Sequence, residues 1–261
     1  MTPHGTYLGA DVGADNSCES CHGSALGHIE EGDPAKIVNP GNHGQFDGSI
    51  LCLSCHKSAK MDEWSFSAHS TGDVNCSDCH SVHMDYSAAR NKGPELCYTC
   101  HSEVKASTYM PSHHPIAEGK LDCSDCHNPH GGPARLTANR TGRELCFSCH
   151  GEIEGPHVYE HAPVNEDCGI CHQPHGSVAN NLLKQNEPTL CLSCHPMHFH
   201  GTVVSVDGEF SVPQAPERAS TSTSDGFKRG MLTKCTQCHT EVHGSDLPSQ
   251  SISTGGTGLT R

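Results

Sequence analysis

Only 33% of the 261 residues are hydrophobic and 5% are aromatic, which is too little apolar side chain for an ordinary core in a chain of this length. The formal net charge of −14 argues against nucleic-acid binding, because phosphate backbones attract basic surfaces. A chain this polar is typical of disorder unless something other than its side chains fills the core. The 18 cysteines and 23 histidines indicate what that is.

Residues 1–50 carry one Cys-x-x-Cys-His motif within a stretch rich in Gly, Asp and Asn, which leaves little room for long regular elements. The chain opens with Met1-Thr2-Pro3-His4, which has neither the basic start nor the apolar run of a signal peptide. We therefore expect the numbering to start after processing or after a truncation. No apolar stretch approaches the length of a membrane span.

From Leu51 to residue 207, the sequence predicts a repeated array of seven motifs. Two forms of the motif alternate, and together they make three paired units that start at Cys76, Cys123 and Cys168, 47 and then 45 residues apart. Such a period is typical of a chain that stacks one structural unit. The form Leu-Cys-x-x-Cys-His begins at Leu51, Leu96, Leu145 and Leu190, and the form Cys-x-x-Cys-His-x-x-His covers Cys76–His83, Cys123–His130 and Cys168–His175.

The expected fold is mostly irregular, with short α-helices of one to three turns over the motifs, broken by Gly and Pro. Little β-structure is expected, apart from weak strand patterns at Thr202–Val206 and Phe210–Val212. Residues 208–234 are rich in Ser, Thr and Pro and are predicted to be a linker. Residues 235–261 hold the last motif and a tail without periodicity.

All 18 cysteines fall into nine Cys-x-x-Cys-His motifs, which is the signature of covalent c-type haem attachment: both thiols add to the haem, and the adjacent histidine ligates the iron. A disulfide scaffold or paired zinc knuckles would not require a histidine after every second cysteine. We therefore predict nine haem c groups, which also supply the missing core. Covalent attachment takes place after export, so the location is extracytoplasmic. The motifs are Cys18/Cys21/His22, Cys52/Cys55/His56, Cys76/Cys79/His80, Cys97/Cys100/His101, Cys123/Cys126/His127, Cys146/Cys149/His150, Cys168/Cys171/His172, Cys191/Cys194/His195 and Cys235/Cys238/His239.

Fourteen histidines remain after the nine proximal ligands, enough to give every iron a second imidazole. The repeat itself selects six distal candidates, His69, His83, His114, His130, His161 and His175, and His28, His200 and His243 complete nine. His4 and His113 are close rivals, and His43, His157 and His198 are expected to be mostly solvated. A histidine three residues after the proximal one leaves a helical turn in a similar direction, so it should ligate a neighbouring haem rather than its own.

The chain resembles the MtrA/DmsE-type periplasmic multihaem cytochromes, which carry electrons through an outer-membrane porin. The resemblance lies in five stretches of the chain. These are Cys18-Glu-Ser-Cys-His-Gly23, the segment His113–Gly119 that leads into Cys123–Gly131, Cys191-Leu-Ser-Cys-His-Pro-Met-His-Phe-His-Gly201, His243-Gly-Ser-Asp-Leu-Pro-Ser-Gln250 and the closing Gly258-Leu-Thr-Arg261. Members of that family typically hold ten haems, and this sequence has nine motifs. Its opening, Thr2-Pro3-His4-Gly5, resembles the residues directly after the family's first motif, so one haem was lost or the chain starts late.

The resemblance implies an elongated haem wire built from two-haem repeats, located in the periplasm and outer membrane and inserted in a β-barrel porin. Its partners would be that porin, an extracellular multihaem cytochrome and periplasmic electron-donor cytochromes, and no nucleic acid. The expected function is electron transfer along bis-histidine haems for extracellular electron exchange, without enzymatic chemistry. The alternatives are an extracellular cytochrome filament subunit and a multihaem terminal reductase, which would need an iron without a sixth ligand.

Overall fold

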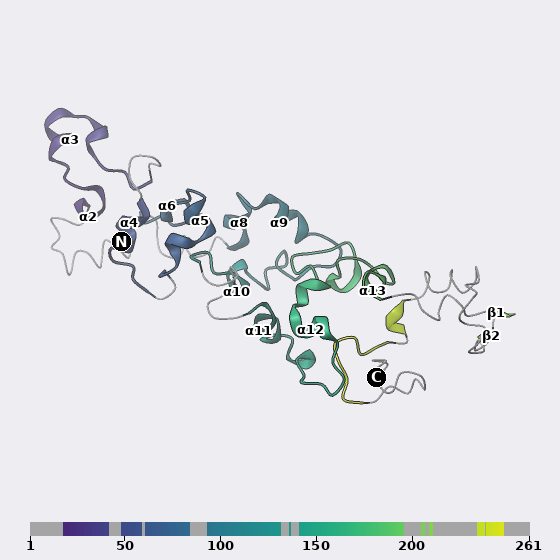
Figure 1. Ribbon diagram of the computed structural model, residues 1–261. Coiled ribbons are helices and arrows are strands. Elements are labelled where there is room, and N and C mark those ends of the chain that lie inside the picture. Colours follow the sequence, from purple (N-terminus) through teal and green to yellow (C-terminus); the bar gives the residue numbers. More distant parts are fainter. Residues whose placement is uncertain are drawn as a thin grey trace. The chain divides into compact units, whose positions relative to one another are not determined.

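The computed structural model describes residues 18–41, 48–58, 61–83, 93–131, 136, 141–195, 205–206, 209–210, 234–237 and 239–247. Its helices are three to six residues long and are joined by irregular connections (Figure 1). The chain divides into two compact units. The first unit comprises residues 1–102 and 119–141, and the second comprises residues 103–118 and 142–261. The expected short helices over the attachment motifs are confirmed.

The first unit contains α-helices and short 3-10 helices, written η. Several coincide with the attachment motifs, and two others carry the spare histidines His28 and His69. Its elements are α2 (Glu19–His22), α3 (Leu26–Glu31), η1 (Pro34–Lys36), α4 (Gly48–Leu53), η2 (Trp64–Phe66), α5 (Ala68–Thr71), α6 (Cys76–Cys79), α8 (Gly93–Tyr98) and α10 (Cys123–Cys126).

The second unit repeats this pattern. The weak strand pattern expected near residues 202–212 forms a two-stranded antiparallel ribbon, in which Ser205 pairs with Phe210 and Val206 with Glu209. Its elements are α9 (Ser102–Ser107, whose first residue belongs to the first unit), α11 (Gly142–Phe147), η4 (Gly151–Ile153), α12 (Ala162–Glu166), η5 (Cys168–Ile170), η6 (Asn180–Leu182), α13 (Thr189–Leu192), β1 (Ser205–Val206), β2 (Glu209–Phe210) and η8 (Cys235–Gln237).

Capping explains why so short a segment as α6 or α10 is helical. Asp78 accepts a hydrogen bond from the main-chain N–H of Asn75 at 2.7 Å. Asp125 accepts from the N–H of Asp122 at 2.8 Å, and both helices have a complete capping box. Each box satisfies main-chain donors that a single helical turn leaves unpaired. The acidic residue between the two cysteines therefore positions the attachment site.

The Leu-Cys-x-x-Cys-His helices end with a different device. A hydroxyl residue precedes the second cysteine in all four of these motifs, and its Oγ donates to the leucine carbonyl three residues earlier. This bond closes the last turn just before the proximal histidine. The pairs are Ser54 with Leu51 and Thr99 with Leu96, both at 2.7 Å, and Ser148 with Leu145 and Ser193 with Leu190, both at 2.6 Å.

The apolar core is very small. Among the described residues, the buried hydrophobic side chains are Trp64, Tyr98, Phe147 and Ala179. Tyr98 and Phe147 both follow the first cysteine of a Leu-Cys-x-x-Cys-His motif, so the aromatic ring is buried at the attachment helix itself. The part of the chain that the structure describes contains no helix with the length and apolar character needed to cross a membrane. The division into four sequence segments and the elongated wire remain predictions, and most of the proposed linker lies outside the described residues.

Candidate functional site

Each attachment motif closes the same main-chain turn. In every motif the N–H of the proximal histidine donates to the carbonyl of the first cysteine, at 2.8–3.0 Å. The turn presents two thiols and one imidazole from a single short stretch of chain, as attachment to one haem requires. The proximal histidines held in this way are His22, His56, His80, His101, His127, His150, His172, His195 and His239.

The two cysteines of a motif differ in exposure. The described first cysteines are half-buried, except Cys18, which is exposed. Of the described second cysteines, Cys21 and Cys171 are half-buried, whereas the others lie exposed where a haem edge can reach them: Cys55, Cys79, Cys100, Cys126, Cys149 and Cys194. Covalent attachment at these cysteines remains a prediction.

First cysteines of successive attachment motifs meet in pairs. Helix α4 contacts α6, α8 contacts α10, and α11 contacts η5. Each of these elements carries the first cysteine of its motif, and the described cysteines are free thiols. Every such contact therefore joins two attachment sites that are consecutive in the sequence. Hydrogen bonds between thiols link Cys52 with Cys76, Cys97 with Cys123, and Cys191 with Cys235.

These contacts hold the thiols in their protonated form. The hydrogen bond with Cys76, and then burial, raise the pKa of Cys52. Burial, with the neighbouring Cys123, raises the pKa of Cys97 to about 11. Burial, with a neighbouring thiol of the last motif, likewise raises the pKa of Cys191 to about 12. Thiols of this kind are unreactive until a specific partner engages them, because the thiolate is the nucleophilic form.

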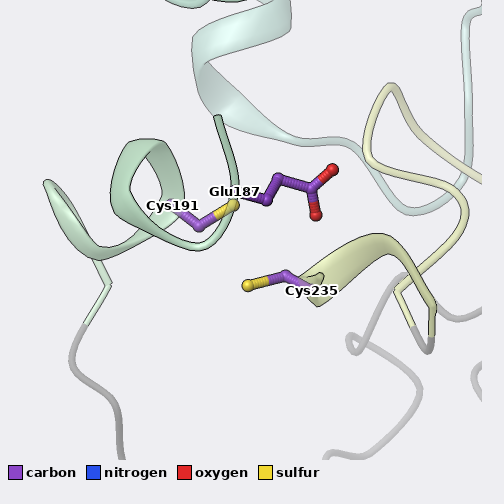
Figure 2. A group of neighbouring side chains, drawn as sticks. All are labelled: Glu187, Cys191 and Cys235. Atoms are coloured by element: carbon purple, nitrogen blue, oxygen red, sulfur yellow. The ribbon is translucent and has the colours of Figure 1, made fainter. Parts of the chain in front are cut away.

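Figure 2 shows one of these contacts, between Cys191 and Cys235, with the carboxylate of Glu187 beside the two sulfur atoms. The donor atoms of the three residues lie within 4.8 Å of one another, so they could hold a metal ion. However, both oxygens of Glu187 accept hydrogen bonds from Thr236, one from its N–H and one from its hydroxyl, each at 2.8 Å. A structural zinc site takes four ligands, and the two sulfurs belong to two separate attachment motifs. We interpret the group as a contact between neighbouring attachment sites.

Histidine rings form the second recurrent arrangement. Among the described residues, six pairs of imidazoles have ring centres 5.8–6.3 Å apart, and each pair joins a proximal histidine to a spare histidine from another part of the chain. Each pair lies within one unit. In order of the proximal residue, the pairs are His22 with His83, His80 with His130, His101 with His69, His150 with His114, His172 with His243, and His195 with His161.

The separation of the rings fits a shared iron atom. Imidazole nitrogens bind first-row metals at about 2 Å, so two imidazoles on opposite sides of one metal have ring centres about 6 Å apart. Burial, and then the neighbouring His172 and His161, lower the pKa of His243, which keeps that ring neutral as metal ligation requires. The donor set and its spacing therefore fit bis-histidine haem.

Main-chain carbonyls orient five of these rings through Nδ1, which leaves Nε2 available for iron. Two are proximal ligands: His22 donates to the carbonyl of Val38 at 2.8 Å, and His172 donates to that of Asn181 at 3.0 Å. Three are distal candidates, and each donates to the residue just before another distal candidate. These bonds run from His69 to Pro129 at 2.9 Å, from His114 to Pro174 at 2.6 Å, and from His161 to Val242 at 2.8 Å.

In each of these three ties, as we call the hydrogen bonds from His69, His114 and His161, the accepting residue is followed by a distal candidate and then by a glycine. A Cβ on Gly131 would lie 2.9 Å from the carbonyl oxygen of Glu63, and one on Gly176 would collide with that of Ser107. A Cβ on Gly244 would collide with the ring of His157. Contacts under 3.0 Å are too close for a Cβ, so glycine is required at these three close approaches. In the sequence, the dipeptide His-Gly marks each of these close approaches.

The geometry also separates the rival candidates. The Nδ1 of His113 donates to the carbonyl of Met110 and its Nε2 lies 2.9 Å from Glu118, so both nitrogens of that ring are occupied. These two bonds, with Glu118 the stronger influence, raise the pKa of His113. His114, by contrast, lies against the proximal His150. This arrangement favours His114 over its neighbour as the ligand.

The remaining proximal histidines are His56, His127 and His239. Their main-chain turns match those of the other six, but the six ring pairs do not include them. The main chain of His127 also forms an isolated antiparallel bridge with that of Leu136. Iron ligation by these three histidines remains a prediction that depends on the sequence motif.

The remaining distal candidates are less well defined. Within the described residues, His28 contacts no other imidazole, and its Nδ1 is buried without a hydrogen-bond partner. The assignments of His28 and His175 as distal ligands remain predictions. The expectation that His157 is mostly solvated is wrong, because its side chain is only 21% exposed and its ring lies against the main chain of Gly244. His4, His43, His198, His200 and Cys238 lie outside the described residues.

Sequence comparison supports the two-haem repeat. The chain matches the Doubled CXXCH motif family at residues 69–106, 113–155 and 161–198, which are the three paired units expected from the sequence, including the histidine that precedes each. It is 36% identical over 155 residues to the "Multiheme cytochrome MtrA" of Shewanella baltica. That match covers 57% of this chain and 46% of the relative, so the chain spans about half the length of the curated relative it matches.

Proposed function

We propose that this chain, a multihaem c-type cytochrome, transfers electrons along nine covalently bound haems, each with two histidine ligands. The observation that carries this proposal is the set of six histidine pairs, because every pair combines one proximal histidine with one spare histidine. An iron with two imidazole ligands has no open position for a substrate, and it changes only its oxidation state. This favours a carrier over a reductase.

The distal ligands proposed for the six pairs obey two rules. A histidine just ahead of one motif ligates the iron of the motif after it. His69, for example, lies ahead of the motif of His80 and ligates the iron of the motif of His101. A histidine three or four residues after a proximal histidine ligates the iron of a motif two positions earlier, as His130 does for His80. Both rules link different haems through one short stretch of chain. We propose His28, His175 and His200 as the remaining distal ligands.

The protein residues position the haems and exclude other chemistry. Contacts between first cysteines, such as Cys52 with Cys76, would place two covalently attached haem edges next to each other. Bound haem supplies the one-electron exchange between ferric and ferrous iron. The chain supplies neutral imidazoles whose Nδ1 protons are held by carbonyls, which fixes the tautomer and the orientation of each ligand. Close spacing and fixed ligands favour successive electron hopping.

We place the protein in the periplasm and outer membrane, inserted in a β-barrel porin. Periplasmic donor cytochromes would lie at one end and an extracellular multihaem cytochrome at the other. The similarity to a multihaem cytochrome of the MtrA type supports this assignment. The proposal includes export of the chain before haem attachment.

Four measurements test the proposal. Intact mass should show nine haem additions, and spectroscopy of the resting protein should show low-spin haem throughout. A substantial high-spin signal would favour the reductase alternative, because it reports an iron without a sixth ligand. Purification from membranes of the native organism should yield a co-eluting barrel protein. Electron microscopy that instead showed ordered fibres would favour the filament alternative.

A further inference from the structure

The six histidine pairs differ in how their ring planes cross. Three pairs are close to parallel, with interplanar angles of 11°, 18° and 19° for the pairs of His22, His80 and His172. The other three are rotated by 64°, 52° and 31°, for the pairs of His101, His150 and His195. All three rotated pairs have a proximal histidine from a Leu-Cys-x-x-Cys-His motif, and none of the parallel pairs does.

The hydrogen bonds at Nδ1 show the same division. In each rotated pair the distal ring is the one tied to a main-chain carbonyl, by the bonds of His69, His114 and His161. In two of the parallel pairs the tied ring is instead the proximal one. A ring that binds iron through Nε2 can rotate about that bond, but rotation carries Nδ1 away from its acceptor. The carbonyl therefore fixes the angle of the ring plane.

Ring planes matter because an imidazole donates π-electron density into the iron d orbital that is perpendicular to its plane. Two parallel rings donate into the same orbital, which separates the two d orbitals in energy and stabilises ferric iron. As the planes rotate apart, the rings donate increasingly into both orbitals, and the energy gap between the two orbitals narrows. A crossed haem is consequently easier to reduce than a parallel haem of the same ligands, and its ferric form has a more anisotropic magnetic signal.

We propose that the chain holds two classes of haem, crossed at the Leu-Cys-x-x-Cys-His motifs and parallel at the others, with the carbonyls of Pro129, Pro174 and Val242 as the positioning groups. This rests on the bis-histidine ligation proposed above. The paired units that start at Cys76 and Cys168 each contain one haem of each class. Sites that are easier and harder to reduce then alternate within a unit, although their ligands are identical.

Each tie also joins two haems. The carbonyl that accepts from His69 belongs to the residue before His130, which faces a different proximal histidine. Gly131, the next residue, lies against the carbonyl of Glu63. A displacement of this short segment would therefore disturb the crossed haem of His101 and the parallel haem of His80 together, without removing a ligand from either.

The first test is electron paramagnetic resonance of the fully oxidised wild-type holoprotein. We expect two sets of low-spin ferric signals of comparable intensity, one rhombic and one highly anisotropic. Low-spin signals of a single type would overturn the proposal of two classes while leaving bis-histidine ligation intact. A dominant high-spin signal would instead contradict the ligation itself, so the two failures are distinguishable without any variant.

The second test uses Gly131→Ala, with Gly119→Ala as its matched control. Both glycines have positive φ, 119° and 69°, so both substitutions strain the backbone. A Cβ would collide with Glu63 at position 131, whereas it would meet nothing within 4 Å at position 119. We expect Gly131→Ala to shift one component of each signal set and Gly119→Ala to shift neither. A change confined to one set in Gly131→Ala, or equal changes in both variants, would contradict the shared tie.

Discussion

The imidazoles of His80 and His130 face each other with ring centres 5.9 Å apart and planes only 18° from parallel, although each follows a different pair of haem-attachment cysteines. His130 lies three residues after its own proximal histidine, His127, and therefore cannot turn back to the opposite face of the haem at that motif. Trp64 packs against the same ring, with centres 6.2 Å apart, and supports its orientation. The pairing ties two segments of the first unit together.

The first prediction is that His130→Ala opens the haem attached to Cys76 and Cys79. Loss of the distal imidazole leaves one iron with a single protein ligand, so one haem of the set should become high-spin in resonance Raman and paramagnetic resonance spectra. His113→Ala is the matched control, because both nitrogens of His113 are already bound to protein groups. It should leave every haem low-spin.

Cryo-electron microscopy of the wild-type holoprotein would check which haem is involved. A map in which His130 binds the iron held by Cys123 and Cys126 would contradict the pairing. Replacement of His175 by Ala is expected to behave similarly, and to open a haem other than that of Cys168 and Cys171.

A second prediction concerns Gly176→Ala. The added Cβ would collide with the carbonyl oxygen of Ser107, so the backbone has to move where Ser112 and Ser177 pair through hydrogen bonds of 3.2 and 2.8 Å. Overpacking of this kind costs about 1–3 kcal/mol, and we expect a lower midpoint of thermal unfolding for the holoprotein. Gly151→Ala is the control, since its Cβ meets nothing within 4 Å. An equal loss of stability in both variants would show that the close approach is not the cause.

The third prediction concerns the interval before the last motif. The hydrogen bonds from His69 and His114 each reach a carbonyl 60 residues further along the chain, whereas the bond from His161 reaches one 81 residues further. The 21 extra residues (81 against 60) fall where the sequence becomes rich in Ser, Thr and Pro. We predict that deletion of residues 211–231 leaves all haems attached and low-spin, as judged by intact mass and absorption spectra. The appearance of a high-spin haem would mean that this stretch positions His243 or the last motif.

The sequence predicted the paired repeat and the short helices over the motifs, because both depend on local chemistry. Two cysteines and a histidine at fixed spacing define one predicted attachment site, and a histidine recurs seven to nine residues ahead of the first cysteine of each unit. The choice between His113 and His114 needed tertiary structure, since only the fold places Glu118 and Met110 around one of the two rings.

Other features could not be predicted from spacing alone. The partner of His130 depends on which segments pack together, and the crossing angles depend on carbonyls 60 or more residues away. His157 was expected in solvent because no repeat selects it, yet the approach of Gly244 encloses its ring. The hydroxyl before the second cysteine, as in Ser54 and Thr99, is present in the sequence, but the spacing of the motif does not reveal that it closes the helix.

The last prediction is that folding depends on haem and yields an extended molecule. The described chain buries Trp64, Tyr98, Phe147 and Ala179 as its hydrophobic core. Four such side chains contribute at most about 1.5–3 kcal/mol each, whereas ordering the backbone costs about 1–2 kcal/mol per residue. Apolar porphyrin faces and iron–histidine bonds have to supply the difference.

Protein produced without haem attachment should therefore lack a cooperative unfolding transition in circular dichroism, while the holoprotein shows one. Because the repeats donate ligands to near neighbours, they favour a linear array over a sphere. Small-angle scattering of the holo-monomer should give a radius of gyration clearly above the roughly 18 Å expected for a compact chain of this length. A folded haem-free chain, or a compact holoprotein, would contradict the haem wire and remove the main structural argument for long-range electron transfer.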